Sequence, residues 1–295
     1  MHAPPSRHLL ARLTLRGLPT LLMLGLAVVV GGVGSYRAIL RHLSVRHVAA
    51  ALVVAMGWWA ARLARWHLLA TRSMPELSWR QTVRSMLAGT ISLGVPPWEA
   101  RVRAASVIAS ENRVGLTGLA QLHTVLDIVV IGGAAAVGAF GVNALAVIGL
   151  SLALFLALIE HVRRLQWTSQ GTPQRLARAL AKVSSLELLG AIGLAIIAYA
   201  SILLEFHLLL RACGAVDFRV ALRSVPFVLL AQLLPVGVPG VGAPELTAAC
   251  VLSAHGRAAE GVLATAGLFV LNRLLPCVGV RLAGRSRACA PIGAE

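Results

Sequence analysis

The chain has 295 residues, of which 58% are apolar and 13% are charged, and its mean hydropathy is +0.81. Soluble domains are about half apolar and roughly a quarter charged, so the composition excludes an ordinary soluble protein and indicates an integral membrane protein. The formal net charge of +16 does not predict nucleic-acid binding, because the arginines form short clusters between apolar runs and no zinc-finger, RNP or basic-heptad motif is present. Such clusters are typical of the flanks of membrane spans.

Six apolar segments approach the ~20 residues that a crossing helix needs. They are Leu18–Ser35, Val48–Leu69, Val114–Phe140, Val142–Glu160, Glu187–Leu210 and Ala258–Val280. Two further apolar stretches, Ser85–Pro97 and Val225–Pro244, are interrupted by glycine and proline, which break helices. Because lipid cannot satisfy the backbone groups that a break frees, both stretches are predicted to be re-entrant. The predicted fold is an all-α, multi-pass helical bundle with about six full crossings and two re-entrant broken helices.

The distribution of basic residues predicts the orientation of these segments. With the N-terminus in the cytoplasm, the inside regions hold 17 arginine and lysine residues and the outside regions hold 7, as the positive-inside rule requires. The chain is therefore predicted to be a multi-pass protein of the cell inner membrane with both termini in the cytoplasm. The first apolar run is interpreted as a retained span and not as a removed signal peptide.

An internal repeat divides the predicted single transmembrane domain, 1–295. "RWHLLATRSMPELSWRQTVRS" (Arg65–Ser85) and "EFHLLLRACGAVDFRVALRS" (Glu205–Ser224) share an aromatic-His-Leu-Leu group, an arginine and an aromatic-Arg-x3-Arg-Ser group, at offsets of 140 and then 139. Each block leads into a break that contains Gly-Val-Pro. The same succession of matching groups in both blocks indicates a first repeat over 37–160 and a second repeat over 187–280. A basic interfacial connector over 161–186 is predicted between them.

The orientation of the two repeats follows from the number of crossings between them. Counting the predicted spans places them in opposite directions across the membrane, which makes the repeat inverted. Many secondary transporters have this plan, with broken helices from both repeats forming the binding site near the midplane. The alternative is a gene duplication that left only a stable scaffold.

Two charged residues in the second repeat are candidates for substrate binding. Glu245 follows the break in "LLPVGVPGVGAPEL", and Arg273 stands alone in the final apolar segment. A charge within the membrane is by default a functional-site hypothesis, and Arg273 is the predicted partner of Glu245. The alternative is an ion pair that only docks the re-entrant segment. Glu245 also suits the start of a helix over Leu246–Leu252, where a negative charge meets the positive end of the helix dipole.

The first repeat offers a second group of candidates. Glu99 and Arg103 follow its break, and Arg103 is predicted to contact a phosphate because a guanidinium matches phosphate oxygens; an interfacial arginine is the alternative. His123 and Asp127 are four residues apart and so share a helix face. They could form a proton relay, half a metal site or a hydrogen-bonded packing pair.

The sequence lacks the common short motifs of enzymes and cofactor-binding proteins. HExxH, GxSxG, Walker A and CxxC motifs do not occur, and the His123 and Asp127 pair has no third ligand at metal spacing. The chain is therefore expected to have no metal site, no cofactor and no enzymatic activity.

The break in the second repeat carries a resemblance to a known family. It is similar to the signature of the lysylphosphatidylglycerol synthase transmembrane region, a flippase-like membrane family: proline, two residues, Pro-Gly-Gly, any residue, glycine, two residues and glutamate. The positions that match this spacing are Pro235, Gly240, Gly242 and Glu245. Val238 and Pro239 stand where the family has proline and glycine.

Two other helices of that family, one in each half of the chain, also have counterparts. Arg273, in "LFVLNRLL", resembles the arginine of the family's late helix, and Asp127, in "HTVLDIVV", resembles the acid of another helix, with Ile128 in place of the following arginine. The resemblance implies that the chain binds or moves a lipid, either a membrane phospholipid or a polyprenyl-linked lipid. It also implies a stand-alone member without the aminoacyltransferase domain.

Three functions follow as hypotheses. The first is a lipid flippase or lipid transporter that binds the headgroup in a cavity formed by the two re-entrant segments. The second is an accessory membrane subunit that presents lipid to a separately encoded transferase without transporting it. The third is an intramembrane enzyme that uses His123 and Asp127.

Overall fold

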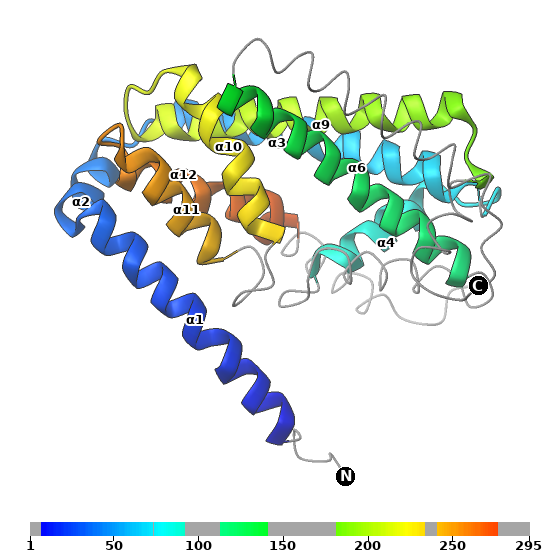
Figure 1. The fold of residues 1–295 in the computed structure, drawn as a ribbon, viewed down its shortest axis with the longest axis horizontal. Helices are drawn as coiled ribbons and strands as arrows, with labels where there is room; N and C mark the ends of the chain where they lie inside the picture. Colours follow the sequence, from blue (N-terminus) through cyan, green and yellow to red (C-terminus); the bar gives the residue numbers. More distant parts are fainter. Residues whose placement is uncertain (1–6, 73, 92–112, 141–180, 234–240, 277–295) are drawn as a thin grey trace, which may run out of the picture.

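The computed structural model describes residues 7–72, 74–91, 113–140, 181–233 and 241–276 (Figure 1). Within these ranges, every regular element is helical, which confirms the all-α prediction for this part of the chain. The helices in chain order are α1 (Arg7–Gly31), α2 (Val33–Arg41), α3 (Val45–Ala70), α4 (Trp79–Ile91), α6 (Arg113–Phe140), α9 (Ser185–Cys213), α10 (Phe218–Leu233), α11 (Ala243–Ser253), α12 (Ala258–Phe269) and the π-helical turn η2 (Val270–Leu274).

Three helices within the described ranges are long and apolar enough to cross a membrane. They are Val45–Ala70, Gly118–Ala136 and Ser185–Cys213, and they coincide with three of the six predicted crossings. A fourth span is possible only if Gly17–Gly31 and Val33–Arg41 count as one, and these two helices meet at 77°. The chain therefore has the helices of a membrane protein, and the first predicted crossing is a bent pair instead of a straight helix.

The other predicted segments fall partly or wholly outside the described residues. Val142–Glu160 lies outside them. Ala258–Val280 corresponds to α12 and η2, which end at Leu274. The re-entrant stretch Ser85–Pro97 begins within α4, and Val225–Pro244 spans α10, an undescribed interval and the start of α11. Six crossings, both re-entrant breaks and the inverted repeat consequently stay predictions.

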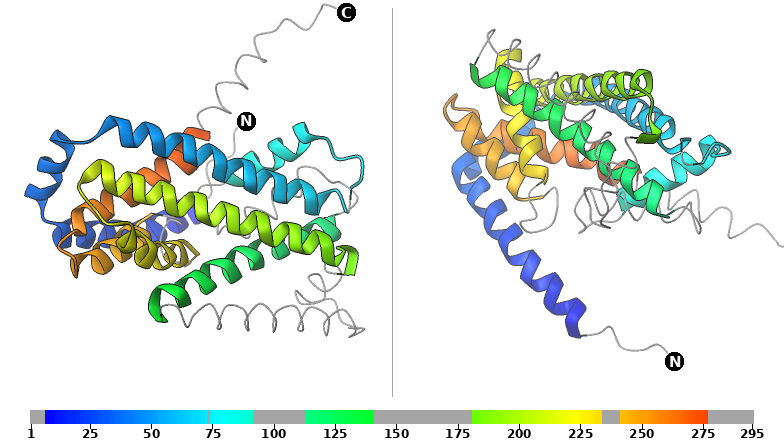
Figure 2. Two further views of the ribbon diagram at one scale, coloured as in Figure 1. Left: turned by 90° about the horizontal axis from the view of Figure 1, so that it is seen from above. Right: turned by 45° about the vertical axis from the view of Figure 1, so that its right-hand side comes forward.

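The long helices α3 and α9 run antiparallel and side by side along one face of the bundle (Figure 2). The Ser44 N–H donates a hydrogen bond to the Ala212 carbonyl (3.0 Å), which joins the beginning of α3 to the end of α9. At mid-length, a methyl group on Gly57 would lie 3.8 Å from Ser201 Oγ, so the two backbones approach closely there. Small residues at such contacts are what membrane helices use to pack. The pair forms the frame against which α6, α10, α12 and η2 lie.

The sequence at the start of α9 explains why the helix begins there. Ser184 Oγ accepts a hydrogen bond from the Glu187 N–H (3.3 Å), and the Glu187 side chain accepts one from the Ser184 N–H (2.9 Å). This capping box satisfies two backbone donors that a helix start leaves open. Glu187 also forms an ion pair with Arg72, which follows α3. Both ends of the α3 and α9 pair are thus tied together.

The N-terminal helices cover α11 and α12. The second half of α1 packs on these two helices, while its first half extends away from the bundle (Figure 1). The chain then turns at Gly32, which has a φ of +73° that favours glycine. The Tyr36 hydroxyl donates a hydrogen bond to the Ala27 carbonyl across this bend (3.0 Å). The bend between α1 and α2 is therefore fixed by backbone geometry and by one side chain.

The two repeat blocks form the same local contact in both halves. In the first block, the rings of His67 and Trp79 stack with centroids 4.0 Å apart and an angle of 20° between the planes. In the second, His207 and Phe218 meet edge to face at 5.2 Å. In each half, this contact joins the last turns of a long helix to the first residue of a shorter one, α4 or α10.

Candidate functional site

A cavity of about 110 Å³ lies between α3, α6, α9, α10 and η2. Its polar lining residues are Arg62, Asp127, Tyr199, Gln232 and Arg273. The rest of its wall is apolar or aromatic, with Trp58, Ile131 and Ile202 among the contributors. A small polar group fits here, whereas a whole lipid does not.

Arg62 and Asp127 form the polar wall of this cavity on the α3 and α6 side. Arg62 Nη2 lies 3.9 Å from Asp127 Oδ2, and the two side chains are 18% and 20% exposed. The Arg62 guanidinium also lies over the Trp58 ring, 4.4 Å from its centroid. A guanidinium on an aromatic face keeps its charge in a weakly hydrated place, so α3 presents a cation in the middle of an apolar helix.

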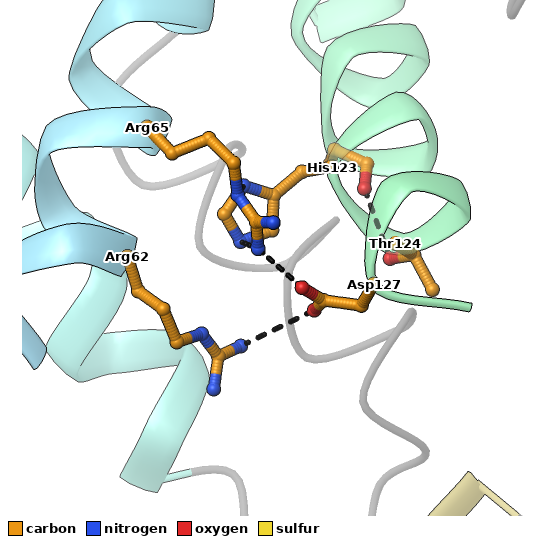
Figure 3. Close-up of polar contacts among 6 residues, drawn as sticks. Arg62, Arg65, His123, Thr124 and Asp127 are labelled. Carbon is orange, nitrogen blue, oxygen red and sulfur yellow. Dashed lines mark hydrogen bonds and ion pairs between the residues drawn. The ribbon is translucent and has the colours of Figure 1, made fainter. Parts of the chain in front are cut away.

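Arg65 lies one helical turn further along α3 and is completely buried. Its Nε donates a hydrogen bond to His123 Nδ1 (3.1 Å), its Nη2 lies 3.0 Å from His123 Nε2, and it forms an ion pair with Asp127 (Figure 3). His123 and Asp127 therefore lie on one side of α6, as their spacing predicts, but they are linked through Arg65. Asp127 is shared by two arginines, which places the one carboxylate of this group between two cations.

A second buried polar contact joins α9 to η2. Glu205 is 0% exposed, and Asn272 Nδ2 donates hydrogen bonds to both of its carboxyl oxygens, Oε1 at 2.8 Å and Oε2 at 2.9 Å. Asn272 is 6% exposed. The next residue, Arg273, lines the cavity. The π-helical turn thus directs one side chain to Glu205 and its neighbour to the cavity; such turns are frequent at functional sites.

The two fully buried groups lie on opposite sides of the cavity along the α3 and α9 pair. The cavity contacts α9 between Ala195 and Ile202, and Glu205 lies beyond it toward the C-terminal end of α9. Because α3 runs antiparallel to α9, Arg65 lies beyond the cavity toward the other end. The cavity is therefore bounded by a buried arginine group at one end and a buried carboxyl group at the other.

Glu245 occupies a different place, in the first turn of α11. Its side chain is 3% exposed and accepts a hydrogen bond from the Gly242 N–H (2.6 Å). Gly242 has a φ of +93°, and a methyl group there would meet the Thr20 carbonyl oxygen at 3.1 Å. Glu245 therefore caps its own helix where the backbone turns closely beneath α1, consistent with the expected helix start.

The predicted site residues are consequently not all brought together. Asp127 and Arg273 line one cavity and His123 contacts Arg65 beside it, whereas Glu245 and Gly242 lie at the start of α11. No ion pair joins Glu245 to Arg273 in the described part of the chain. Glu99, Arg103, Pro235 and Gly240 lie outside the described residues. The described side chains include no cluster suited to a metal ion.

Sequence reasoning missed four of the residues that organise this site. These are Arg62, Arg65, Glu205 and Asn272. The first three are charges inside predicted apolar crossings, and the rule that singled out Glu245 and Arg273 applies to them equally. Arg62 and Arg65 are three apart, and His123 and Asp127 are four apart, so each pair shares a helix face. No sequence signal shows, however, that these faces meet.

No protein-family model and no curated protein sequence matches the chain. The arrangement of the side chains therefore carries the functional argument.

Proposed function

We propose that the chain is a lipid flippase or lipid transporter that binds a lipid headgroup in the cavity between α3, α6, α9, α10 and η2. The observation that carries this proposal is a cavity, among candidate membrane-spanning helices, whose described lining includes two arginines and one aspartate. Charges are costly in the middle of a membrane and mark substrate pathways there. A lipid headgroup is the polar ligand that reaches such a position from the bilayer itself.

The lining favours an anionic headgroup. Its described ionisable side chains carry two positive charges, on Arg62 and Arg273, and one negative charge, on Asp127. Guanidinium groups match phosphate oxygens in pairs, and Gln232 and Tyr199 add neutral polar groups. The volume of about 110 Å³ suits a phosphate while the acyl chains stay outside. The expected ligand is the phosphate of a phospholipid or of a polyprenyl-linked lipid.

The position of the buried groups supports the predicted inverted repeat. Arg65 and Glu205 are 140 residues apart, which is the offset of the repeat blocks, and they lie on opposite sides of the cavity. Repeats related by an axis in the membrane plane place equivalent residues on opposite sides of the midplane and the binding site between them. Tyr199, at the middle of α9, lines the cavity, as expected for a site near the midplane.

The predicted re-entrant breaks have a place in this proposal. Leu229 and Gln232, in the last two turns of α10, line the cavity, and the break predicted around Gly240 follows directly. The second break is therefore expected to begin beside the bound headgroup, and the first break, with Glu99 and Arg103, to approach it from the other face. Movement of one repeat against the other gives access from alternate sides.

A leaflet-exchange assay in reconstituted vesicles tests this function. Labelled phosphatidylglycerol and labelled phosphatidylcholine are each placed in one leaflet, and their exchange is measured for wild type, Arg62→Ala, Arg273→Ala and Arg223→Ala. Arg223 is exposed on α10 and serves as the matched control. Exchange is expected to fall at least tenfold for the two cavity variants and to stay unchanged for the control. Equal exchange by all variants would overturn the site, and no exchange of any lipid by wild type would overturn transport.

The two alternative functions give different results in the same preparation. An accessory subunit binds labelled lipid through Arg62 and Arg273 without moving it, and it co-purifies with a transferase. An intramembrane enzyme loses turnover in His123→Ala. The contacts of both His123 ring nitrogens with Arg65 (3.1 and 3.0 Å) favour a positioning role for His123 over a catalytic one.

A further inference from the structure

The contact between Glu205 and Asn272 is not explained by packing of the helices alone. Glu205 is completely buried on α9, after a run of uncharged residues over 188–204, and Asn272 is the one side chain that the described part of the chain brings within hydrogen-bonding distance of it. Its neighbours include Phe206, Leu209 and Leu271, which belong to a cluster of buried apolar residues. Among the described residues, this carboxyl group accepts two hydrogen bonds from a neutral amide and forms no ion pair.

The other ionisable groups around α9 do not supply that cation. On α9 and on the helices packed against it, the side chains with contacts elsewhere are His47, Arg62, Arg65, His67, His123, Asp127, Glu187, His207 and Glu260. The exposed side chains are Arg46, Arg211, Arg219 and Arg223. Arg273 follows Asn272 directly but lines the cavity.

The hydrogen-bonding capacity of Asn272 distinguishes the two protonation states of Glu205. Asn272 Nδ2 donates to the carboxyl oxygens, while no donor in the described part of the chain reaches the buried Asn272 Oδ1. An ionised carboxylate only accepts hydrogen bonds and leaves Oδ1 unsatisfied. A protonated acid has an O–H that donates to Oδ1 after a small rotation of the amide, while Nδ2 keeps the other carboxyl oxygen. Both groups are then satisfied, which buried polar groups require.

We propose that Glu205 is a proton-binding site, at which the neutral acid and the Asn272 amide form a two-hydrogen-bond pair. The ligand is a proton, and the bond that forms is the O–H of the carboxylic acid. Loss of that proton leaves a buried anion that still accepts from Asn272 Nδ2 but leaves Asn272 Oδ1 without a donor, which weakens the pair that holds η2. Because Arg273 follows Asn272 on the same π-helical turn, occupancy by the proton fixes the position of a cavity arginine.

Infrared spectroscopy of the purified protein tests this site without any transport assay, so its outcome is independent of the proposed lipid movement. The carbonyl stretch of a protonated carboxylic acid is separated from the carboxylate bands. At neutral pH, the difference spectrum of wild type minus Glu205→Gln is expected to show one protonated-acid band. Glu260→Gln is the matched control, because Glu260 is also buried but its Oε1 lies 2.8 Å from Arg257 Nη1, and its difference spectrum is expected to show only carboxylate bands.

A second variant keeps the test decisive if Glu205→Gln does not fold. Asn272→Leu retains Glu205 and removes the amide, so the protonated-acid band is expected to move to higher frequency as its hydrogen bonds are lost. A wild-type difference spectrum with only carboxylate bands for Glu205 would overturn the proposal. An acid band that Asn272→Leu leaves unmoved would overturn the pairing.

Discussion

Buried charges in this protein occur in pairs or groups. Removing one member leaves the others buried without a partner, which lowers the free energy of unfolding. Arg65 is the clearest case, because it is completely buried and contacts both His123 and Asp127. Removing one partner of a buried pair is destabilising by about 3–5 kcal/mol, whereas replacing both with apolar residues is often neutral. The stability of α3 against α6 is therefore expected to depend on the completeness of this group, not on the charge of Arg65 itself.

A two-step substitution measures this dependence. Arg65→Met is expected to lower the free energy of unfolding in detergent by on the order of 3 kcal/mol, and the double variant Arg65→Met, Asp127→Leu is expected to recover most of it. Arg223→Met, at an exposed position of α10, should change it by less than about 0.5 kcal/mol. A double variant no more stable than Arg65→Met would show that the arginine acts through packing alone.

Gly242 positions the start of α11 through its backbone conformation and its lack of a side chain. Its φ is +93°, and an added methyl group would meet the Thr20 carbonyl oxygen at 3.1 Å and Met23 Cε at 3.2 Å. Gly256 is a natural comparison, since it has a φ of +64° but no atom within 4 Å of an added methyl group. Gly256→Ala is expected to cost about 1 kcal/mol from backbone conformation alone.

Gly242→Ala is expected to cost more, about 2–3 kcal/mol, because contact with α1 adds to the backbone term. The free energies of unfolding of the two variants in detergent give the comparison. Equal losses would mean that α1 does not press on the start of α11. The sequence singles out Gly242 as part of a family signature. The structural requirement for glycine comes from the nearby Thr20 carbonyl, on a helix more than 200 residues earlier, and so could not be predicted from the local sequence.

At the scale of elements, long apolar runs were predictable and their partners were not. The sequence predicted α3, α6 and α9 to within a few residues, because some 20 apolar residues leave few alternatives. The π-helical turn at Val270–Leu274 carries no comparable signal, since it depends on how Asn272 meets Glu205. Likewise, the expected pairing of Glu245 with Arg273 rested on charge alone, and the structure assigns these residues to different surroundings.

The register of α3 against α9 is directly testable by cross-linking. In a background without the four native cysteines, Gly57→Cys with Ser201→Cys is expected to form a disulfide, because these positions face each other and disulfides need Cα atoms within about 7 Å. Gly57→Cys with Gly190→Cys is the mismatched control, displaced by 11 residues or about 16 Å along α9. Cross-linking of the mismatched pair in place of the matched one, detected by gel mobility, would contradict this register.

For the whole molecule, the antiparallel pair predicts which loops share a side of the membrane. His42 and Ala215 are exposed near the joined ends of α3 and α9, and Glu76 and Ser184 are exposed near the opposite ends. Cysteines at His42 and Ala215 are expected to react with a membrane-impermeant thiol reagent from outside intact cells, and cysteines at Glu76 and Ser184 only after permeabilisation. Different sides for His42 and Ala215 would mean that α3 and α9 do not cross together.

The same labelling experiment tests the pairing of the loops separately from their orientation in the membrane. The grouping of the four positions follows from the helix pair, whereas the assignment of the outer side follows only from the arginine and lysine distribution. A complete reversal would leave the fold intact and correct the orientation. The apolar pattern predicts two further crossings, over Val142–Glu160 and Ala258–Val280.

The lengths of α3 and α9 have a mechanical consequence. At 1.5 Å per residue, their 26 and 29 residues extend about 39 and 43 Å, against a hydrocarbon layer of about 30 Å. Because they are joined at both ends, they must tilt as one body, and the angle follows the thickness of the surrounding lipid. A thick bilayer of long acyl chains is expected to give the pair a small tilt angle, and a thin bilayer of short chains a large one. Lipid composition alone therefore changes the angle between the bundle and the membrane plane.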